Sequence, residues 1–147
     1  MSRPHIPTNF YFSFLDCLVD AKRHIVSIGG EFGLTSIQAI TLLLLDENHP
    51  RPMKNFCLVF HCDASNVTGI VDGLEQRNLV ERQNDPKDRR VKVVRITPAG
   101  KRMQQQIIKR LDDENGFMFD PLTDTEAAQL VHIIEKLARA KNPTQRA

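Results

Sequence analysis

The feature that most constrains the fold is residues 79–97, in which two short alternating stretches, LVERQ and VKVVRIT, flank the turn signal Asp85-Pro86. Alternating apolar and polar residues on both sides of a turn predict two β-strands joined as a hairpin. Residues 81–102 contain eight lysines and arginines against three acidic residues, whereas residues 112–147 contain four against seven. A basic hairpin beside an acidic C-terminal segment indicates a surface that faces a polyanion.

Two helical segments precede this hairpin. Residues 53–60 are a short apolar segment, and a turn near His61-Cys62 separates them from a helix that Asp63 can cap. The apolar stripe of that second helix consists of Val67, Ile70, Val71 and Leu74. Its opposite face carries Ser65, Asn66, Thr68, Gly69, Asp72 and Gln76. Two helices joined by a turn predict a helix-turn-helix motif.

Further helices are expected on the N-terminal side. Apolar residues at helical spacing predict one helix over residues 10–28, ended by Gly29-Gly30. A second helix begins at Thr35, with Gln38 in the position of a capping box, and is expected to run to about Glu47. Its apolar residues lie on more than one face, which indicates a helix packed between other elements.

Two more helices are expected after the hairpin. Thr97-Pro98 supplies a cap and a first-turn proline for a helix through about Asn115. A final helix opens with the capping box of Thr123 and Glu126. The predicted fold is therefore mainly α with a small β-hairpin (α+β). A winged helix-turn-helix over residues 35–97 is flanked by dimerisation helices in residues 1–34 and 98–147.

The sequence resembles the MarR family of bacterial and archaeal transcription regulators over roughly residues 34–140. The motifs that carry the resemblance are Leu34, Thr35 and Gln38; Val71, Asp72, Leu74 and Glu75; Leu79, Val80 and Arg82; Asp85 to Arg90; and Ile96, Thr97 and Gly100. The resemblance implies a homodimeric winged-helix protein whose recognition helix enters the major groove of DNA and whose wing reaches the flanking minor groove.

These expectations assign a role to each candidate residue. The N-terminal half of a recognition helix meets base edges, which places Ser65, Asn66, Thr68 and Gly69 nearest the bases. By match to the family's wing, Asp88 braces the loop and Arg90 enters the minor groove with Arg89 close by, where the negative potential is strongest. Arg82, Lys87 and Lys92 would contact phosphates. Arg51, Lys54 and Arg77 would add electrostatic attraction.

The chain departs from the family pattern in its recognition helix. The family often has a lysine or arginine at the positions of Gly69 and Gly73, and residues 63–76 contain neither cation. Electrostatic affinity for DNA must then come mainly from the wing. In the preceding helix, Pro52 replaces a frequent threonine cap and Cys57 a frequent alanine, which leaves the helix start open.

The cysteines offer an alternative. Some members of this family sense peroxide through a cysteine in the first helix, where Cys17 lies, but the neighbouring Asp16 and Asp20 oppose a stabilised thiolate. Cys57 and His61, at i and i+4 with Cys62 adjacent, could share a metal ion, but zinc needs three or four ligands from the right directions, and packing and turn roles are favoured. Three cysteines without a paired framework indicate free thiols in a reducing compartment.

The remaining features set limits on function. The 147 residues suffice for one domain, and the longest apolar run, AITLLLL, is too short for a bilayer span of about 20 residues. The sequence has no phosphate-binding glycine loop and no nucleophile elbow.

We therefore expect a cytoplasmic, dimeric, sequence-specific DNA-binding regulator without enzymatic activity or cofactor. It would read a pseudo-palindromic operator as a repressor released by a small ligand. The resemblance suggests an anionic aromatic effector. The alternatives are a winged-helix protein-interaction module and a redox-sensing regulator.

Overall fold

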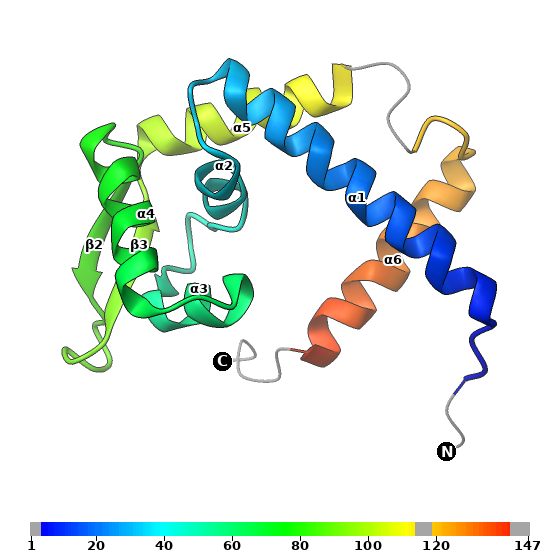
Figure 1. The fold of residues 1–147 in the computed structure, drawn as a ribbon. Coiled ribbons are helices and arrows are strands. Elements are labelled where there is room, and N and C mark those ends of the chain that lie inside the picture. Colours follow the sequence, from blue (N-terminus) through cyan, green and yellow to red (C-terminus); the bar gives the residue numbers. More distant parts are fainter. Residues whose placement is uncertain (1–3, 114–118, 142–147) are drawn as a thin grey trace. The chain divides into compact units, whose positions relative to one another are not determined.

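The computed structural model describes residues 4–113 and 119–141 and confirms a mainly helical fold with a small antiparallel sheet (Figure 1). The helices of this part of the chain are α1 (Thr8–Glu31), α2 (Ser36–Leu43), α3 (Met53–Phe60), α4 (Ala64–Gln76), α5 (Pro98–Asp113) and α6 (Asp124–Lys141). The strands are β1 (Arg51–Pro52), β2 (Val80–Asn84) and β3 (Lys92–Ile96). Residues up to Asp113 form one compact unit, and α6 belongs to a second.

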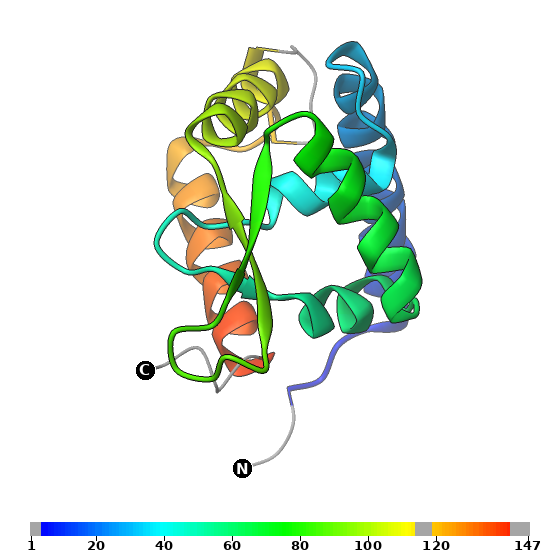
Figure 2. The ribbon, with the colours of Figure 1, turned by 90° about the vertical axis from the view of Figure 1, so that its left-hand side faces the viewer.

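The helix-turn-helix motif is formed by α3 and α4, as the sequence predicts. α3 ends at His61, whose left-handed backbone (φ 50°) reverses the chain before α4 begins. α2, α3, α4 and the sheet surround one hydrophobic core, to which the C-terminal end of α1 and the middle of α5 also contribute (Figure 2). The largest fully buried apolar side chains of this core are Ile28, Leu42, Phe56, Val67, Val71, Leu74, Val94 and Ile107.

The sheet has a third strand that the sequence did not indicate. Its order is β1-β3-β2, and β3 lies in the centre with Val93 and Val94 buried. β1 pairs antiparallel with β3, with Arg51 opposite Val94 and Pro52 opposite Val93. A proline has no N–H to donate, so the edge of a sheet is where it can be tolerated. β1 thereby fixes the start of α3 directly after Pro52, with no side-chain cap.

The prediction that Gly29-Gly30 ends the first helix is wrong. α1 continues to Glu31, and the chain leaves the helix at Gly33, whose φ of 68° favours glycine. The N–H of Gly33 donates to the carbonyl of Gly30 and that of Leu34 to the carbonyl of Gly29, both at 2.9 Å. These two bonds satisfy carbonyls that a helix end leaves open, so the stop signal acts three residues later than expected.

The capping box of α2 is confirmed, but its expected end near Glu47 is wrong. The side chain of Thr35 accepts from the Gln38 N–H at 3.3 Å, and the side chain of Gln38 accepts from the Thr35 N–H at 3.0 Å. α2 ends at Leu43, where Gln104 of α5 donates its side-chain N–H groups to the carbonyls of Leu42 and Leu45. A contact across about 60 positions of chain therefore satisfies the open carbonyls at this helix end.

The two C-terminal helices begin where the sequence predicts. The Thr97 hydroxyl accepts from the Gly100 N–H at 3.0 Å, one turn into α5. The capping box of α6 is present, because Glu126 and Thr123 exchange side-chain and backbone hydrogen bonds. The expected last residues of α5, 114 and 115, lie outside the described residues.

Of the helices described, none alone is long and apolar enough to cross a bilayer. α1 and α2 reach that length and hydropathy only when they are taken together, across a bend of 100°.

Candidate nucleic-acid interface

α4 separates apolar and polar residues onto two faces. Its buried face consists of Val67, Val71 and Leu74. Its exposed or half-buried face carries the four residues expected near bases, Ser65, Asn66, Thr68 and Gly69. Full burial of an aliphatic side chain stabilises a fold by about 1.5–3 kcal/mol, so the core face holds the helix firmly while the other face is left for contacts outside the chain.

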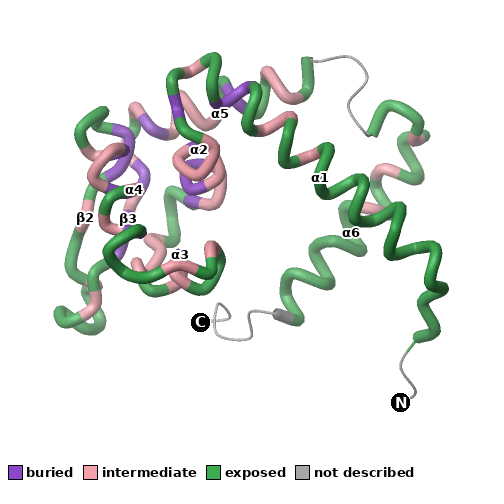
Figure 3. The backbone as a smooth tube through the Cα atoms, in the orientation of Figure 1, coloured by how far each residue is buried: buried purple, intermediate pink, exposed green. Residues whose placement is uncertain are grey.

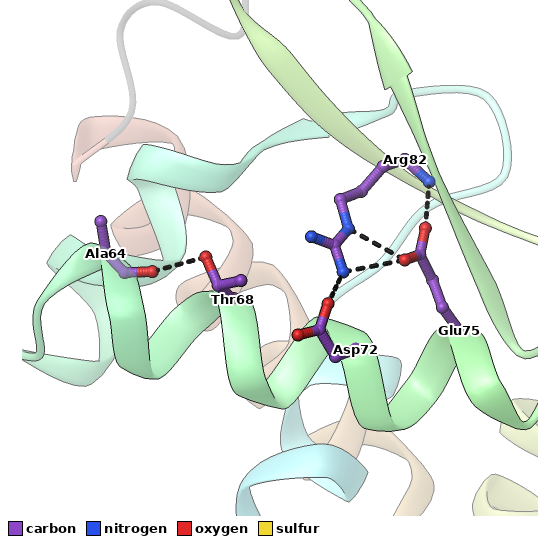
Figure 4. A network of polar contacts seen from close by, with 5 residues as sticks. All are labelled: Ala64, Thr68, Asp72, Glu75 and Arg82. Atoms are coloured by element: carbon purple, nitrogen blue, oxygen red, sulfur yellow. Dashed lines mark hydrogen bonds and ion pairs between the residues drawn. The ribbon is translucent and has the colours of Figure 1, made fainter.

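Hydrogen bonds already engage two of the exposed hydroxyl groups. Asp63 caps α4 by accepting from the backbone N–H of Asn66 at 2.9 Å, and it also accepts from the Ser65 hydroxyl at 2.8 Å. The Thr68 hydroxyl donates to the Ala64 carbonyl at 2.8 Å (Figure 4). Within the described part of the chain, the side-chain amide of Asn66 makes no hydrogen bond. The Asn66 amide therefore keeps both its N–H donors and its acceptor available for a contact outside the chain.

The Asp63 cap makes α4 sensitive to pH. The hydrogen bonds from the Asn66 N–H and the Ser65 hydroxyl lower the pKa of the Asp63 carboxyl below its ordinary value of 3.8. A lowered pKa in the folded state means that the stabilisation is complete above pH 3.8 and is lost as the pH falls through the folded-state pKa. The variant Asp63→Asn keeps a capping oxygen but does not titrate. We expect its urea midpoint to lie below that of the wild type at pH 6, and the gap to close towards pH 3; a constant gap would contradict this role.

The two glycines of α4 differ in what surrounds them. A Cβ added to Gly73 would lie 2.4 Å from the side-chain nitrogen of Gln38, so α4 and α2 approach closely there. A Cβ added to Gly69 would meet nothing within 4 Å. The Gln38 side chain therefore limits the space at Gly73, whereas the space at Gly69 is open, and a glycine there costs about 1 kcal/mol of helix stability relative to alanine.

The wing is a regular hairpin with a braced loop. β2 and β3 pair in register from Val80 opposite Ile96 to Asn84 opposite Lys92. In the loop, Asp85 accepts from the Lys87 N–H at 2.9 Å, and Asp88 accepts from the Arg90 N–H at 3.0 Å. The bracing geometry expected for Asp88 is therefore present, and Asp85 braces the loop in the same way.

The cations of the wing tip extend into solvent. Lys87, Arg89 and Arg90 are exposed, as is Lys92 at the start of β3 (Figure 3). None of these four forms an ion pair with any residue that the structure describes, and the nearby Asp85 and Asp88 accept from backbone N–H groups. In Figures 1 and 2 the wing tip and the N-terminal end of α4 lie at the same lower end of the unit.

Arg82 occupies a different environment from the other wing cations. Its backbone N–H and its Nε donate to the two carboxylate oxygens of Glu75, at 2.7 and 3.0 Å, and its guanidinium also pairs with Asp72 (Figure 4). Hydrogen bonds with a charged donor or acceptor are stronger than neutral ones, and two of them to the same carboxylate are among the stronger contacts in proteins. Arg82 thus connects β2 to the second half of α4, and this placement does not favour the phosphate contact expected from the sequence.

Arg77 and Arg51 are also used within the chain. The guanidinium of Arg77 donates to the carbonyls of Gly33 and Phe32, at 2.8 and 2.9 Å, and so caps the end of α1. The guanidinium of Arg51 lies 5.7 Å from the centre of the Phe56 ring, and burial lowers its pKa. Sequence reasoning missed these intramolecular roles because each joins residues that are distant in the chain or in different elements.

The three cysteines are unpaired. Cys17 is exposed on α1, and a redox role for it stays a prediction. Cys57 and Cys62 are half-buried, and burial, followed by the neighbouring Cys57 and Asp63, raises the pKa of the Cys62 thiol. A raised pKa disfavours the reactive thiolate. Among the described residues, no group of three or more His, Cys, Asp or Glu side chains is arranged to hold a metal ion.

Comparison with known proteins places this arrangement in a family. The family model described as MarR family matches residues 34–92, from two residues before α2 to the first residue of β3. The transcriptional repressor MdtR of Bacillus subtilis is 30% identical over 108 residues, which cover 74% of this chain and 70% of that protein.

Solved structures show the same fold. The crystal structure of apo MarR from Escherichia coli superposes with a TM-score of 0.67 at 20% identity, over 92% of this chain and 98% of that one. CouR from Rhodococcus jostii, solved with p-coumaroyl-CoA bound, gives a TM-score of 0.63 at 26% identity, over 88% of this chain and 90% of that one. The family match, the relative and the shared fold agree with the helix-turn-helix and wing described above. The chain therefore belongs to the MarR family of DNA-binding transcriptional regulators and is not an enzyme.

Proposed function

We propose that the protein is a cytoplasmic, homodimeric repressor that reads a pseudo-palindromic operator and is released by a small ligand. The observation that carries the proposal is the wing tip, where Lys87, Arg89 and Arg90 are exposed and form no ion pair with any described residue, at the same end of the unit as the start of α4. Unpaired cations are costly to gather unless an anion covers them, and a DNA backbone supplies that anion.

The proposed roles follow the geometry. Ser65, Asn66, Thr68 and Gly69 face the bases of the major groove. Arg90, with Arg89 beside it, enters the flanking minor groove, and Lys87 and Lys92 contact phosphates. Arg82 and Arg77 hold α4 in place through contacts within the chain, and we do not propose that they contact DNA.

The exposed apolar side chains of α1 and α6 support the dimer. On α1 these are Phe10, Tyr11, Phe12, Phe14, Leu15, Leu18 and Val19 (Figure 3). On α6 they are Val131, Ile133, Ile134 and Leu137. Large apolar side chains exposed in such numbers along a helix are rare on a monomer and common at obligate interfaces. A second copy would cover it, with α1, α5 and α6 as the dimerisation helices, and the two-fold axis would place two copies of α4 about one helical turn of DNA apart.

Control by a ligand follows the logic of population shift. In one conformation of the dimer the two α4 helices are spaced so that they cannot both bind DNA. A ligand lowers the affinity for DNA only to the extent that it binds this conformation more tightly than the DNA-binding one. The relative CouR was solved with p-coumaroyl-CoA, an anionic aromatic thioester, which supports an effector of related chemistry. The relative MdtR is a repressor, which supports repression here.

Removing the central wing cation tests the proposal. We expect Arg90→Ala to weaken binding to the operator, to relax base preference at its flanks, and to reduce the dependence of binding on salt by up to roughly one unit of slope. The control Arg23→Ala removes another exposed arginine, one that pairs with Asp20 on α1, and should leave all three unchanged. If Arg90→Ala binds as the wild type does, the wing is not a DNA contact, and a protein-interaction module becomes the better account.

A further inference from the structure

We infer that the half-site positions read by α4 are A·T pairs, and that Asn66, Thr68 and Gly69 determine this preference. The inference rests on the proposed function, because it specifies which operators that function can use. It comes from the hydrogen-bonding state of the exposed face of α4, on which donors are scarce.

The first step concerns the hydroxyl groups. The Ser65 hydroxyl donates its proton to Asp63, and the Thr68 hydroxyl donates its proton to the Ala64 carbonyl. A hydroxyl that has donated its single proton can only accept from a base. Asn66 therefore carries the free side-chain N–H donors on the first two turns of α4, and its amide can pair with adenine through N6 and N7.

The second step concerns guanine. A guanine presents two acceptors to the major groove, O6 and N7, and its usual reader is an arginine or lysine that donates to both. α4 has no lysine or arginine between Asp63 and Gln76. Arg82, the nearest cation of the wing, is bound to Asp72 and Glu75. A guanine facing α4 would lose its hydrogen bonds to water and gain few in return, and such unpaired acceptors are penalised.

The third step concerns thymine. Because the Thr68 hydroxyl faces its own helix, its methyl group is left for apolar contact. Gly69 has open space where a side chain would be, so the backbone of α4 can approach the base pair closely. The thymine C5-methyl is the apolar group of the major groove, and a threonine methyl is among its usual partners. The exposed face of α4 thus combines Asn66, which can pair with adenine, with an apolar area at Thr68 and Gly69. This area carries no cation and can contact the thymine of the same or the next base pair.

Base analogues in a duplex recovered from a randomised pool test this inference. The positions that face α4 are those at which Asn66→Ala changes the base preference. We expect A·T pairs there. Replacing adenine by 7-deazaadenine, which lacks N7, should weaken the wild type on the order of 10-fold and leave Asn66→Ala unaffected. Replacing thymine by deoxyuridine, which lacks the methyl group, should weaken the wild type about 4-fold.

A gain of guanine reading provides the second arm. Gly69→Arg restores a cation on α4, and its preference at one position should shift to guanine by about 10-fold or more. The matched control is Gly30→Arg on α1, where an added Cβ also meets nothing within 4 Å; it adds the same charge and should leave base preference unchanged. Guanines at the positions facing wild-type α4 would overturn the inference and leave the proposed function intact. A folded, dimeric protein that enriches no sequence would contradict the proposed function, and this inference with it.

Discussion

Replacing Gly100 by alanine should lower the free energy of unfolding by about 3 kcal/mol, because a small-to-large change at a closed position forces the backbone apart. Gly100 lies buried in the first turn of α5, and an added Cβ would sit 1.9 Å from the carbonyl oxygen of Leu79 and 2.9 Å from a side-chain carbon of Ile96. The Leu79 carbonyl accepts from the Thr97 N–H at 3.1 Å, so it cannot move away without breaking the connection between wing and α5.

Urea unfolding of Gly100→Ala beside Gly30→Ala measures this effect. Both substitutions add one methyl group to a helix, but the space around Gly30 is open. We therefore expect Gly30→Ala to raise the free energy of unfolding by up to about 1 kcal/mol, the usual gain from removing a helical glycine. If the two variants were equally stable, the close approach of α5 to the residue before β2 would be wrong.

Replacing Arg82 by methionine should cost about 2 kcal/mol of stability and should also weaken operator binding more than that loss explains. Methionine keeps the apolar stem of the side chain, but it leaves Asp72 and Glu75 as neighbouring carboxylates without their cation. The side chain of Arg82 is 25% exposed, which keeps the expected cost below that of a fully buried pair. Binding should suffer further because the wing is no longer fixed to α4.

A triple variant separates these two effects. Adding Asp72→Asn and Glu75→Gln to Arg82→Met removes the unpaired charges, so the urea midpoint should recover most of the loss. Operator affinity should stay reduced, because the amides do not restore the contact that positions β2 on α4. If affinity returned together with stability, Arg82 would be a stabilising residue only, with no role in holding the reading surface.

Local signals in the sequence predicted most of the fold. The capping residues Thr35, Asp63, Thr97 and Thr123 marked helix starts that the structure confirms, since a cap is written within four consecutive residues. The ends of α1 and α2 were placed wrongly for two reasons. Gly29-Gly30 continues as helix because Gly33 supplies the left-handed turn, and α2 stops early because Gln104 satisfies its carbonyls.

The candidate site divides in the same way. The turn at Asp85 and, by match to the family's wing, the bracing role of Asp88 were predicted, because such bonds reach only two residues along the chain. The roles of Arg82 and Arg77 were not, because their partners lie 7 to 45 positions away. The sequence shows that a residue is charged but not whether another residue of the chain binds that charge. The sequence therefore predicts a phosphate contact for Arg82, whereas the structure shows it bound to the carboxylates of Asp72 and Glu75.

Selection of binding sites from a randomised duplex pool, at near-physiological salt and with the purified full chain, tests the central claim most directly. The account predicts a single enriched pseudo-palindrome with half-sites about one helical turn apart, bound by two copies of the chain. A folded protein that enriches no sequence, or one that enriches a lone half-site as a monomer, would contradict it.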